Sequence, residues 1–113
     1  MKILNYTPHV VTLYSGGEVI QYPVIGKARV EETSEVMEVE GIPCELSKKA
    51  YGDVVGLPDS DGETIYIVSI VVLQSSDRND IMAPDTGPSS GIRDKEGNLV
   101  AVKRFQINEN FLQ

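Results

Sequence analysis

The chain is a succession of short β-branched segments separated by glycine and proline turns, with no long window showing the 3.6-residue apolar period of a helix. Short strands are predicted at residues 9–14, 18–22, 28–30, 36–39, 42–46, 64–69, 92–94 and 99–105. Residues 64–69 are apolar on both faces and should lie centrally in a sheet. Residues 70–76 fit either a strand or a short helix capped by Ser69. The pattern predicts a mainly β fold, or an α+β fold with at most one short helix, built as a small antiparallel barrel-like or rolled sheet.

A chain of 113 residues predicts a single β-rich domain over 1–107, with 108–113 as a frayed C-terminal tail. Cys44 is the only cysteine, so no intrachain disulfide forms, and a reducing compartment fits best. Its alternation with Ile42 and Leu46 predicts a small core residue. No apolar stretch has the length of a signal peptide core or a membrane span, so a cytoplasmic location and no membrane partner are expected.

The charge of the chain is acidic and unevenly distributed. A formal net charge of −7 argues against binding to nucleic-acid polymers, which requires a basic face. Six acids fall between Glu31 and Glu45, whereas residues 93–104 contain four Lys or Arg. An acidic protein with one local cationic pocket would suit a small anion.

The segment Asn5-Tyr6-Thr7-Pro8-His9 contains the only histidine. Pro8 fixes its own φ and favours an extended Thr7, so Thr7 and His9 would be presented in a defined geometry. An imidazole can act as acid, base or hydrogen-bond donor. The alternative is that Thr7 makes a turn hydrogen bond and His9 merely begins a strand. The sequence leaves both interpretations open.

Arginines at predicted strand ends and a hydroxyl-rich loop complete the candidate site. Guanidinium groups suit phosphate, although Asp77 and Asp94 offer two of them local ion pairs instead. The loop at 86–91 presents hydroxyls and backbone amides but lacks the pattern of a Walker loop. A tyrosine could stack on a base. The candidate ligand-binding residues are Thr7, His9, Arg29, Tyr51, Arg78, Ser89, Ser90, Arg93 and Arg104.

Metal sites and cofactors are not expected. The acidic run 59–63 lacks the glycine and the final glutamate spacing of an EF-hand, since Ile70 stands at the twelfth position. One histidine and one cysteine are too few for zinc unless carboxylates complete the set. No nucleophile–base pair can be identified from the sequence, so we expect no catalytic residues and no enzyme activity.

Three motifs carry a resemblance that covers nearly the whole chain. N-x-T-P-H begins at Asn5, Y-G-x-V-x-G-L-P spans 51–58, and R-D-x-x-G-x-x-V-A-V-x-R spans 93–104. They resemble an uncharacterised family of small proteins common in bacteriophages, prophages and bacteria. The resemblance implies the cytoplasm of an infected or lysogenic bacterial cell. Phage proteins of this size often inhibit host defence, and some sequester nucleotide immune signals; that step is an analogy.

The first functional hypothesis is a homo-oligomeric binding protein that sequesters a small phosphorylated ligand, such as a cyclic or NAD-derived nucleotide. The second is an enzyme that degrades such a ligand, with His9 as acid–base and Asp80 or Asp94 orienting it. The third is a protein-interaction module, in which the acidic segment 31–45 contacts a host protein or serves phage assembly.

Overall fold

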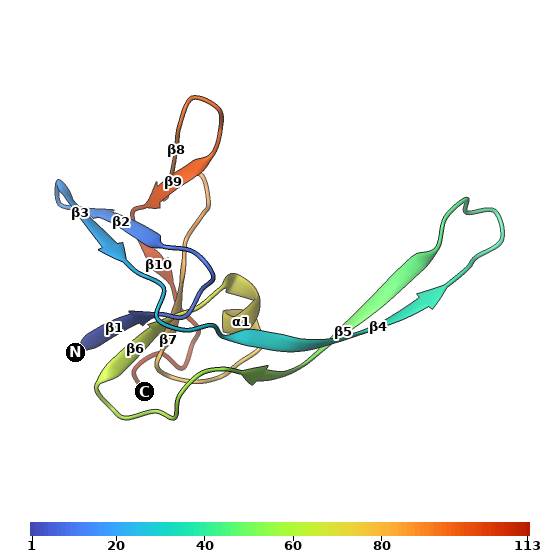
Figure 1. Ribbon diagram of the computed structural model, residues 1–113, viewed down its shortest axis with the longest axis horizontal. Coiled ribbons are helices and arrows are strands. Elements are labelled where there is room, and N and C mark those ends of the chain that lie inside the picture. Colours follow the sequence, from blue (N-terminus) through green and yellow to red (C-terminus); the bar gives the residue numbers. More distant parts are fainter.

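The computed structural model describes residues 1–113 and contains ten strands and one helix, α1, at Ile70–Gln74 (Figure 1). The strands are β1 Lys2–Asn5, β2 Val11–Ser15, β3 Glu18–Tyr22, β4 Arg29–Met37, β5 Leu46–Val55, β6 Thr64–Ile67, β7 Ile81–Pro84, β8 Gly91–Arg93, β9 Leu99–Val102 and β10 Phe105–Gln106. The mainly β class and the single short helix are confirmed. The strands form three small sheets and no closed barrel. The helix is far too short to cross a membrane, and no other helix is present.

The first sheet has the order β1-β6-β7-β10 and contains half of the twelve buried hydrophobic residues. Every residue of β6 is buried, which confirms the predicted central strand. β6 pairs in parallel with both β1 and β7, so the expected antiparallel arrangement does not hold here. Parallel neighbours require a crossover connection, and α1 provides it between β6 and β7. Ser69 caps this helix by accepting a hydrogen bond from the Val72 N–H at 3.4 Å, as the capping alternative predicted.

The second sheet has the order β3-β2-β9-β8 and stands above the first in Figure 1. The β2–β3 hairpin over the Gly16-Gly17 turn follows the prediction closely. The β8–β9 hairpin closes the same sheet, and β9 joins β2 in parallel through the pair Leu13–Val102. This sheet places β9 beside the segment that leads into β2, which creates the pocket described below.

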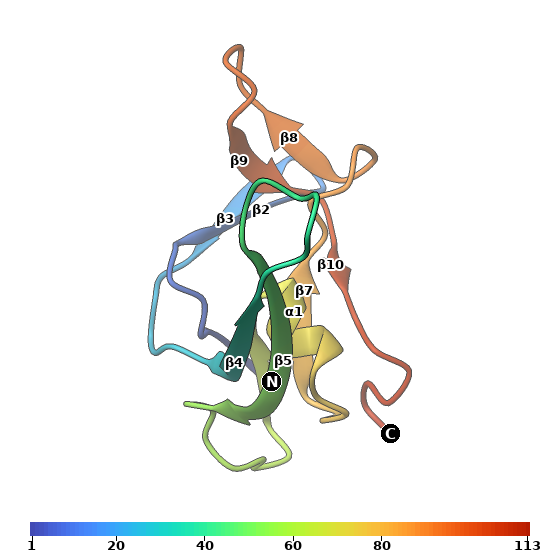
Figure 2. The ribbon, with the colours of Figure 1, turned by 90° about the vertical axis from the view of Figure 1, so that its right-hand side faces the viewer.

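The third sheet consists of β4 and β5 alone and projects from the body as a long arm (Figures 1 and 2). The predicted strands at 36–39 and 42–46 are not formed as such, because β4 ends at Met37 and residues 38–45 are the loop at the tip. Cys44 lies in this loop and is exposed, so its prediction as a core residue was wrong. Strand-like alternation buries a face only where a second layer covers it, and the arm has none.

The C-terminal tail, expected to fray, is held against the loop that precedes β7. Asn108 donates to the backbone oxygens of Ser76 and Arg78, and Asn110 donates to the backbone oxygen of Asp77. Phe111 packs against the core cluster that contains Ile65 and Met82. Asparagine side chains thus anchor the tail by pairing with backbone groups.

Candidate functional site

A tight turn around the buried side chain of Asn5 presents His9. The Asn5 amide donates to the backbone oxygens of His9 and Tyr22, at 2.7 and 2.9 Å. Its carbonyl oxygen accepts the Thr7 N–H at 2.9 Å and the Thr7 hydroxyl at 2.7 Å. Asn5 is only 1% exposed and Thr7 is also buried, whereas Pro8 and His9 are exposed. In the N-x-T-P-H motif, Asn5 and Thr7 are therefore buried structural residues, whereas Pro8 and His9 face outward.

A pocket of about 330 Å³ opens beside this turn. It lies between the segment leading into β2, the start of α1, the end of β7 and strand β9. Its lining residues are Thr7, Pro8, His9, Val10, Val11, Thr12, Ser69, Ile70, Pro84, Thr86, Leu99, Val100, Ala101 and Val102. We refer to it as the His9 pocket.

The His9 pocket combines an apolar wall with a few polar groups at its edge. Val10, Leu99 and Val100 are large, substantially exposed apolar residues of its lining. The His9 imidazole makes no hydrogen bond within the chain, since only its backbone atoms are bonded. The Thr7 hydroxyl oxygen also lies 2.8 Å from the His9 carbonyl oxygen, so its one hydrogen is shared between two acceptors and Thr7 offers no unpaired donor. Such a site suits a flat apolar group with a polar rim.

The loop before β8 lies next to the pocket through Thr86. Arg104 donates to Asp85 at 3.0 Å and also bonds the Ser89 hydroxyl. Ser90 is fully buried, and its hydroxyl oxygen accepts the N–H groups of Lys103 and Arg104 at 3.1 Å each. The loop predicted as an anion cradle thus has its own internal contacts, which fix its shape against β9.

Among the candidate arginines, Arg93 is the one whose neighbour on the adjacent strand lines the His9 pocket. It pairs with Leu99 across the β8–β9 hairpin. It is exposed, and one guanidinium nitrogen donates to the Gly97 carbonyl at 2.9 Å. Its remaining guanidinium N–H groups have no partner within the chain. A phosphate extending from the pocket toward β8 would meet this side chain.

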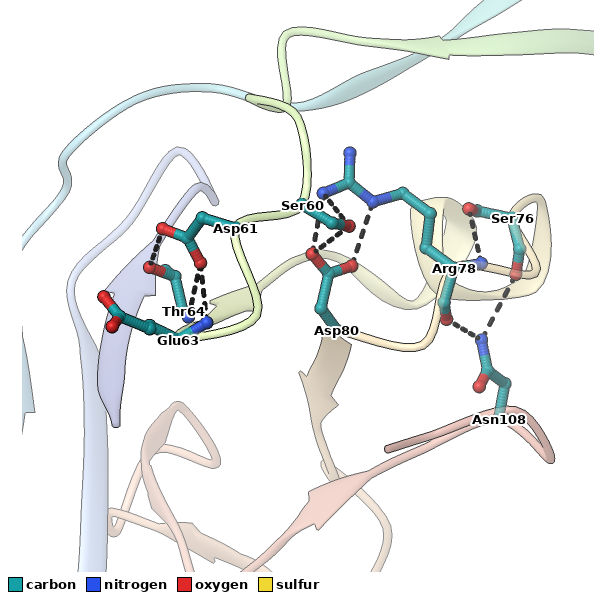
Figure 3. A network of polar contacts seen from close by, with 8 residues as sticks. All are labelled: Ser60, Asp61, Glu63, Thr64, Ser76, Arg78, Asp80 and Asn108. Atoms are coloured by element: carbon teal, nitrogen blue, oxygen red, sulfur yellow. Dashed lines mark hydrogen bonds and ion pairs between the residues drawn. The ribbon is translucent and has the colours of Figure 1, made fainter. Parts of the chain in front are cut away.

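Arg78 lies elsewhere, in an ion pair with Asp80 (Figure 3). Its Nε is 2.9 Å from Asp80 Oδ1 and its Nη2 is 2.8 Å from Oδ2, and Ser60 donates to Oδ2 at 2.8 Å. Burial by itself raises the pKa of Asp80. The hydrogen bonds from Arg78 and Ser60, with the charge of Arg78, outweigh burial and leave that pKa below its usual value. The same guanidinium lies 5.6 Å from the centre of the Tyr66 ring, so Arg78 makes structural contacts with both Asp80 and Tyr66.

Arg29 and Tyr51 belong to the arm. Arg29 begins β4 at its base, and Tyr51 of β5 lies opposite Glu32 with 54% of its surface exposed. Within one chain, the structure therefore groups Thr7 and His9 in one pocket, with Arg93 on the adjacent strand β8. Ser89 and Ser90 lie in the adjoining loop, and Arg104 bonds to that loop from the β9–β10 connection. The structure leaves Arg29, Tyr51 and Arg78 outside this group.

The residues that sequence reasoning missed are mostly apolar. Asn5 builds the turn, and Leu99, Val100 and Ala101 form one wall of the pocket. Nothing in the sequence distinguishes these β9 residues from ordinary strand residues. Only the parallel pairing of β2 with β9 brings them opposite His9.

The carboxylates considered as partners for His9 are bonded elsewhere. Asp80 is held by Arg78 and Ser60, and Asp94 accepts the backbone N–H groups of Glu96 and Asn98 at 3.0 and 2.9 Å. The chain contains no group of three or more His, Cys, Asp or Glu side chains placed to hold a metal ion. Neither carboxylate bonds to the imidazole of His9.

Comparison with known proteins places the chain in no established group. No protein-family model, curated protein or solved structure matches it.

Proposed function

We propose that this protein binds and sequesters a small phosphorylated ligand, a cyclic or NAD-derived nucleotide signal, in the His9 pocket. In this proposal it acts as a phage-type anti-defence protein in the cytoplasm of a bacterial cell and functions as a homo-oligomer. The observation that carries the proposal is an unpaired imidazole held by the Asn5 turn at the edge of an apolar pocket of about 330 Å³.

The size and lining of the pocket support a nucleoside portion as its occupant. Ligand sites have volumes of roughly 300–1,000 Å³, so this pocket is at the small end of the range. It would hold one base and its sugar, leaving the rest of a dinucleotide outside. The base would lie against Leu99, Val100 and Ala101, while His9 and the Thr86 hydroxyl would hydrogen-bond to its edge or to the sugar.

The distribution of charge supports an anionic ligand. Residues 1–30 contain three Lys or Arg and one Glu, and residues 86–107 contain four Lys or Arg and two acids, so each segment has a net charge of +2. The remainder of the chain must then carry −11 to give the total of −7. The two positive segments contain all four strands of the β3-β2-β9-β8 sheet. Arg93 is the one basic residue within these four strands, and a positive side chain near a pocket attracts a small anion to an otherwise acidic protein.

Thermal unfolding with a ligand panel tests this function. The probes are ADP-ribose, cyclic di-AMP, a cyclic trinucleotide and AMP, each added to the native protein and to Ala101→Leu, which narrows the pocket. A ligand at a hundred times its Kd stabilises a fold by about 2.7 kcal/mol, which is a readily measured shift. We expect a shift with one class of probe that is lost in Ala101→Leu. A flat panel, or a shift that Ala101→Leu leaves unchanged, would overturn the proposal.

Heating the complex separates sequestration from catalysis. A sequestering protein releases its ligand intact after denaturation, whereas an enzyme that degrades the ligand releases a product. We expect chromatography of the supernatant to return the probe that gave the shift, in stoichiometric amount. Release of a degradation product would favour the enzyme hypothesis with His9 as acid–base.

A further inference from the structure

The β4–β5 arm is a long hairpin that packs against the body only at its base, where Val30 and Val54 contact the core cluster. β4 has nine residues, so the arm extends about 30 Å at the usual rise per residue. All residues from 31 to 45 are exposed, and the strands pair only with each other (Figure 1). An isolated two-stranded hairpin is at best marginally stable in water. A regular arm of this length therefore needs a surface to pack against.

The dimensions of the chain show how much surface is left uncovered. A compact protein of this mass exposes about 6,100 Å² by general scaling, whereas this chain exposes 7742 Å². Its radius of gyration is 16.9 Å, against about 13 Å for a compact domain of this length. The excess area, about 1,600 Å² per chain, is about twice the ~800 Å² that each partner buries in a standard specific protein interface.

The tip of the arm has the chemistry of a contact surface. Met37, Val39 and Ile42 are each between 43% and 44% exposed, and Val36 is 61% exposed. Among them stand the carboxylates of the acidic segment, which includes six Glu and no Lys or Arg between residues 31 and 45. Exposed apolar side chains bordered by charge are typical of interaction sites.

We propose that the arm binds a second copy of this chain, with its acidic tip lying against the cationic segments 1–30 and 86–107 of that copy. The charges are complementary: the tip loop 38–45 carries −3, and each of those segments carries +2. The contact is reciprocal in a two-fold dimer, so two arms bury the excess area of both chains. Segments 1–30 and 86–107 also contain most of the residues that line the His9 pocket, so the dimer is measured in the absence of ligand, and its failure is distinct from failure of the proposed function.

Sedimentation equilibrium of the native protein over a wide concentration range tests whether the dimer exists. We expect a monomer–dimer equilibrium that weakens as salt is added, since exposed charge pairs are screened. A protein that remains monomeric at every concentration would overturn the inference. So would a dimer that persists when residues 36–47 are replaced by an Asn-Gly turn.

Charge reversal at the tip tests the surface itself. Glu38, Glu40 and Glu45 are changed to Lys together, and the control changes the exposed acids Asp59, Glu63 and Glu109 of the body to Lys. Both variants change the net charge by the same amount, so they differ only in where the changed residues lie. We expect the tip variant to raise the dimer Kd at least tenfold and the control to change it less than threefold. Equal effects would overturn the assignment of the tip. Circular dichroism should show that both variants remain folded, because neither set of side chains contributes to the core.

Cys44 provides an independent readout, since it lies at the tip and is exposed in the single chain. We expect a bulky maleimide to label it at least tenfold more slowly in the native dimer than in the tip variant. Equal labelling rates would contradict the proposal. The proposal would also be overturned if the protein stayed monomeric and its arm instead bound a host protein.

Discussion

The Thr7 hydroxyl lies 2.7 Å from the Asn5 carboxamide oxygen, and both residues are buried. The same carboxamide donates to the backbone oxygens of His9 and Tyr22. Two polar side chains thus tie the turn at residues 5–9 to the end of β3. The backbone of His9 is thus held by two hydrogen bonds to its carbonyl oxygen.

Replacing Thr7 by valine should weaken this turn without changing its volume. The Thr7→Val protein loses one buried donor, and we expect a loss of about 1–2 kcal/mol in the free energy of unfolding. Thr12→Val is the control, because the half-buried Thr12 makes no side-chain hydrogen bond within the chain; it should change stability by less than about 0.5 kcal/mol. Urea titration measures both values. Equal losses would mean that the Asn5–Thr7 contact contributes nothing specific.

Gly56 marks the place where the arm meets the body. Its φ is +95°, and an added Cβ would lie 2.1 Å from the Lys27 carbonyl oxygen. Gly56→Ala should therefore cost at least about 2 kcal/mol, since both the backbone and its neighbour must move. Gly62 has a φ of +76° but open space around it, so Gly62→Ala should cost only about 1 kcal/mol. A smaller loss for Gly56→Ala than for Gly62→Ala in the same denaturant series would contradict this account of the junction.

The Arg78–Asp80 pair should give the protein a defined acid sensitivity. The pKa of Asp80 is lowered in the folded state, so its ionisation stabilises the fold above the unfolded value of about 3.9. That contribution is lost as the pH falls through the lower, folded pKa. We expect Asp80→Asn to destabilise the protein by about 1–2 kcal/mol at pH 7, because Arg78 is left partly buried without its carboxylate.

The pH profile distinguishes this ion pair from a simple packing contact. The difference in unfolding free energy between native protein and Asp80→Asn should be constant from about pH 7 to pH 5 and should shrink below about pH 4. Asp59→Asn, at an exposed position, should follow the native curve throughout. A difference that does not change with pH would show that the charge of Asp80 is not what stabilises the fold.

Arg93 should contribute to affinity and not to stability. It is exposed, and only one of its guanidinium N–H groups bonds within the chain, to a turn carbonyl. We expect Arg93→Ala to reduce affinity for the best probe of the nucleotide panel by at least tenfold, with a nearly unchanged Tm. Arg29→Ala, at the base of the arm, should leave that affinity within threefold. Isothermal titration calorimetry decides between them, and unchanged affinity in Arg93→Ala would remove this arginine from the site.

Local signals predicted the hairpins, the central strand and the helix cap. The Gly16-Gly17 turn between two β-branched runs predicted the β2–β3 hairpin. The 64–69 segment, apolar on both faces, predicted β6. The parallel pairs were not predictable in this way. They depend on which distant segments meet, and neither β1 nor β7 carries a local mark of its partner.

The candidate site was predictable only in part for the same reason. The single histidine in a proline turn drew attention to Thr7 and His9, which do line a pocket. The arginines looked alike in sequence, yet Arg78 is committed to Asp80 while most of the Arg93 guanidinium is unpaired. Cys44 was misassigned because alternation alone does not reveal whether a second layer covers a strand.

Mapping the bound probe by amide chemical shifts tests the central claim most directly. The isotope-labelled protein is titrated with whichever probe of the panel stabilises it, or with ADP-ribose if none does. The account predicts saturable shifts concentrated at residues 7–12, 69–70 and 99–102, with small changes along the arm. Shifts confined to the arm or to the Arg78–Asp80 region, or no saturable shifts at all, would contradict the assignment of the His9 pocket as the ligand site.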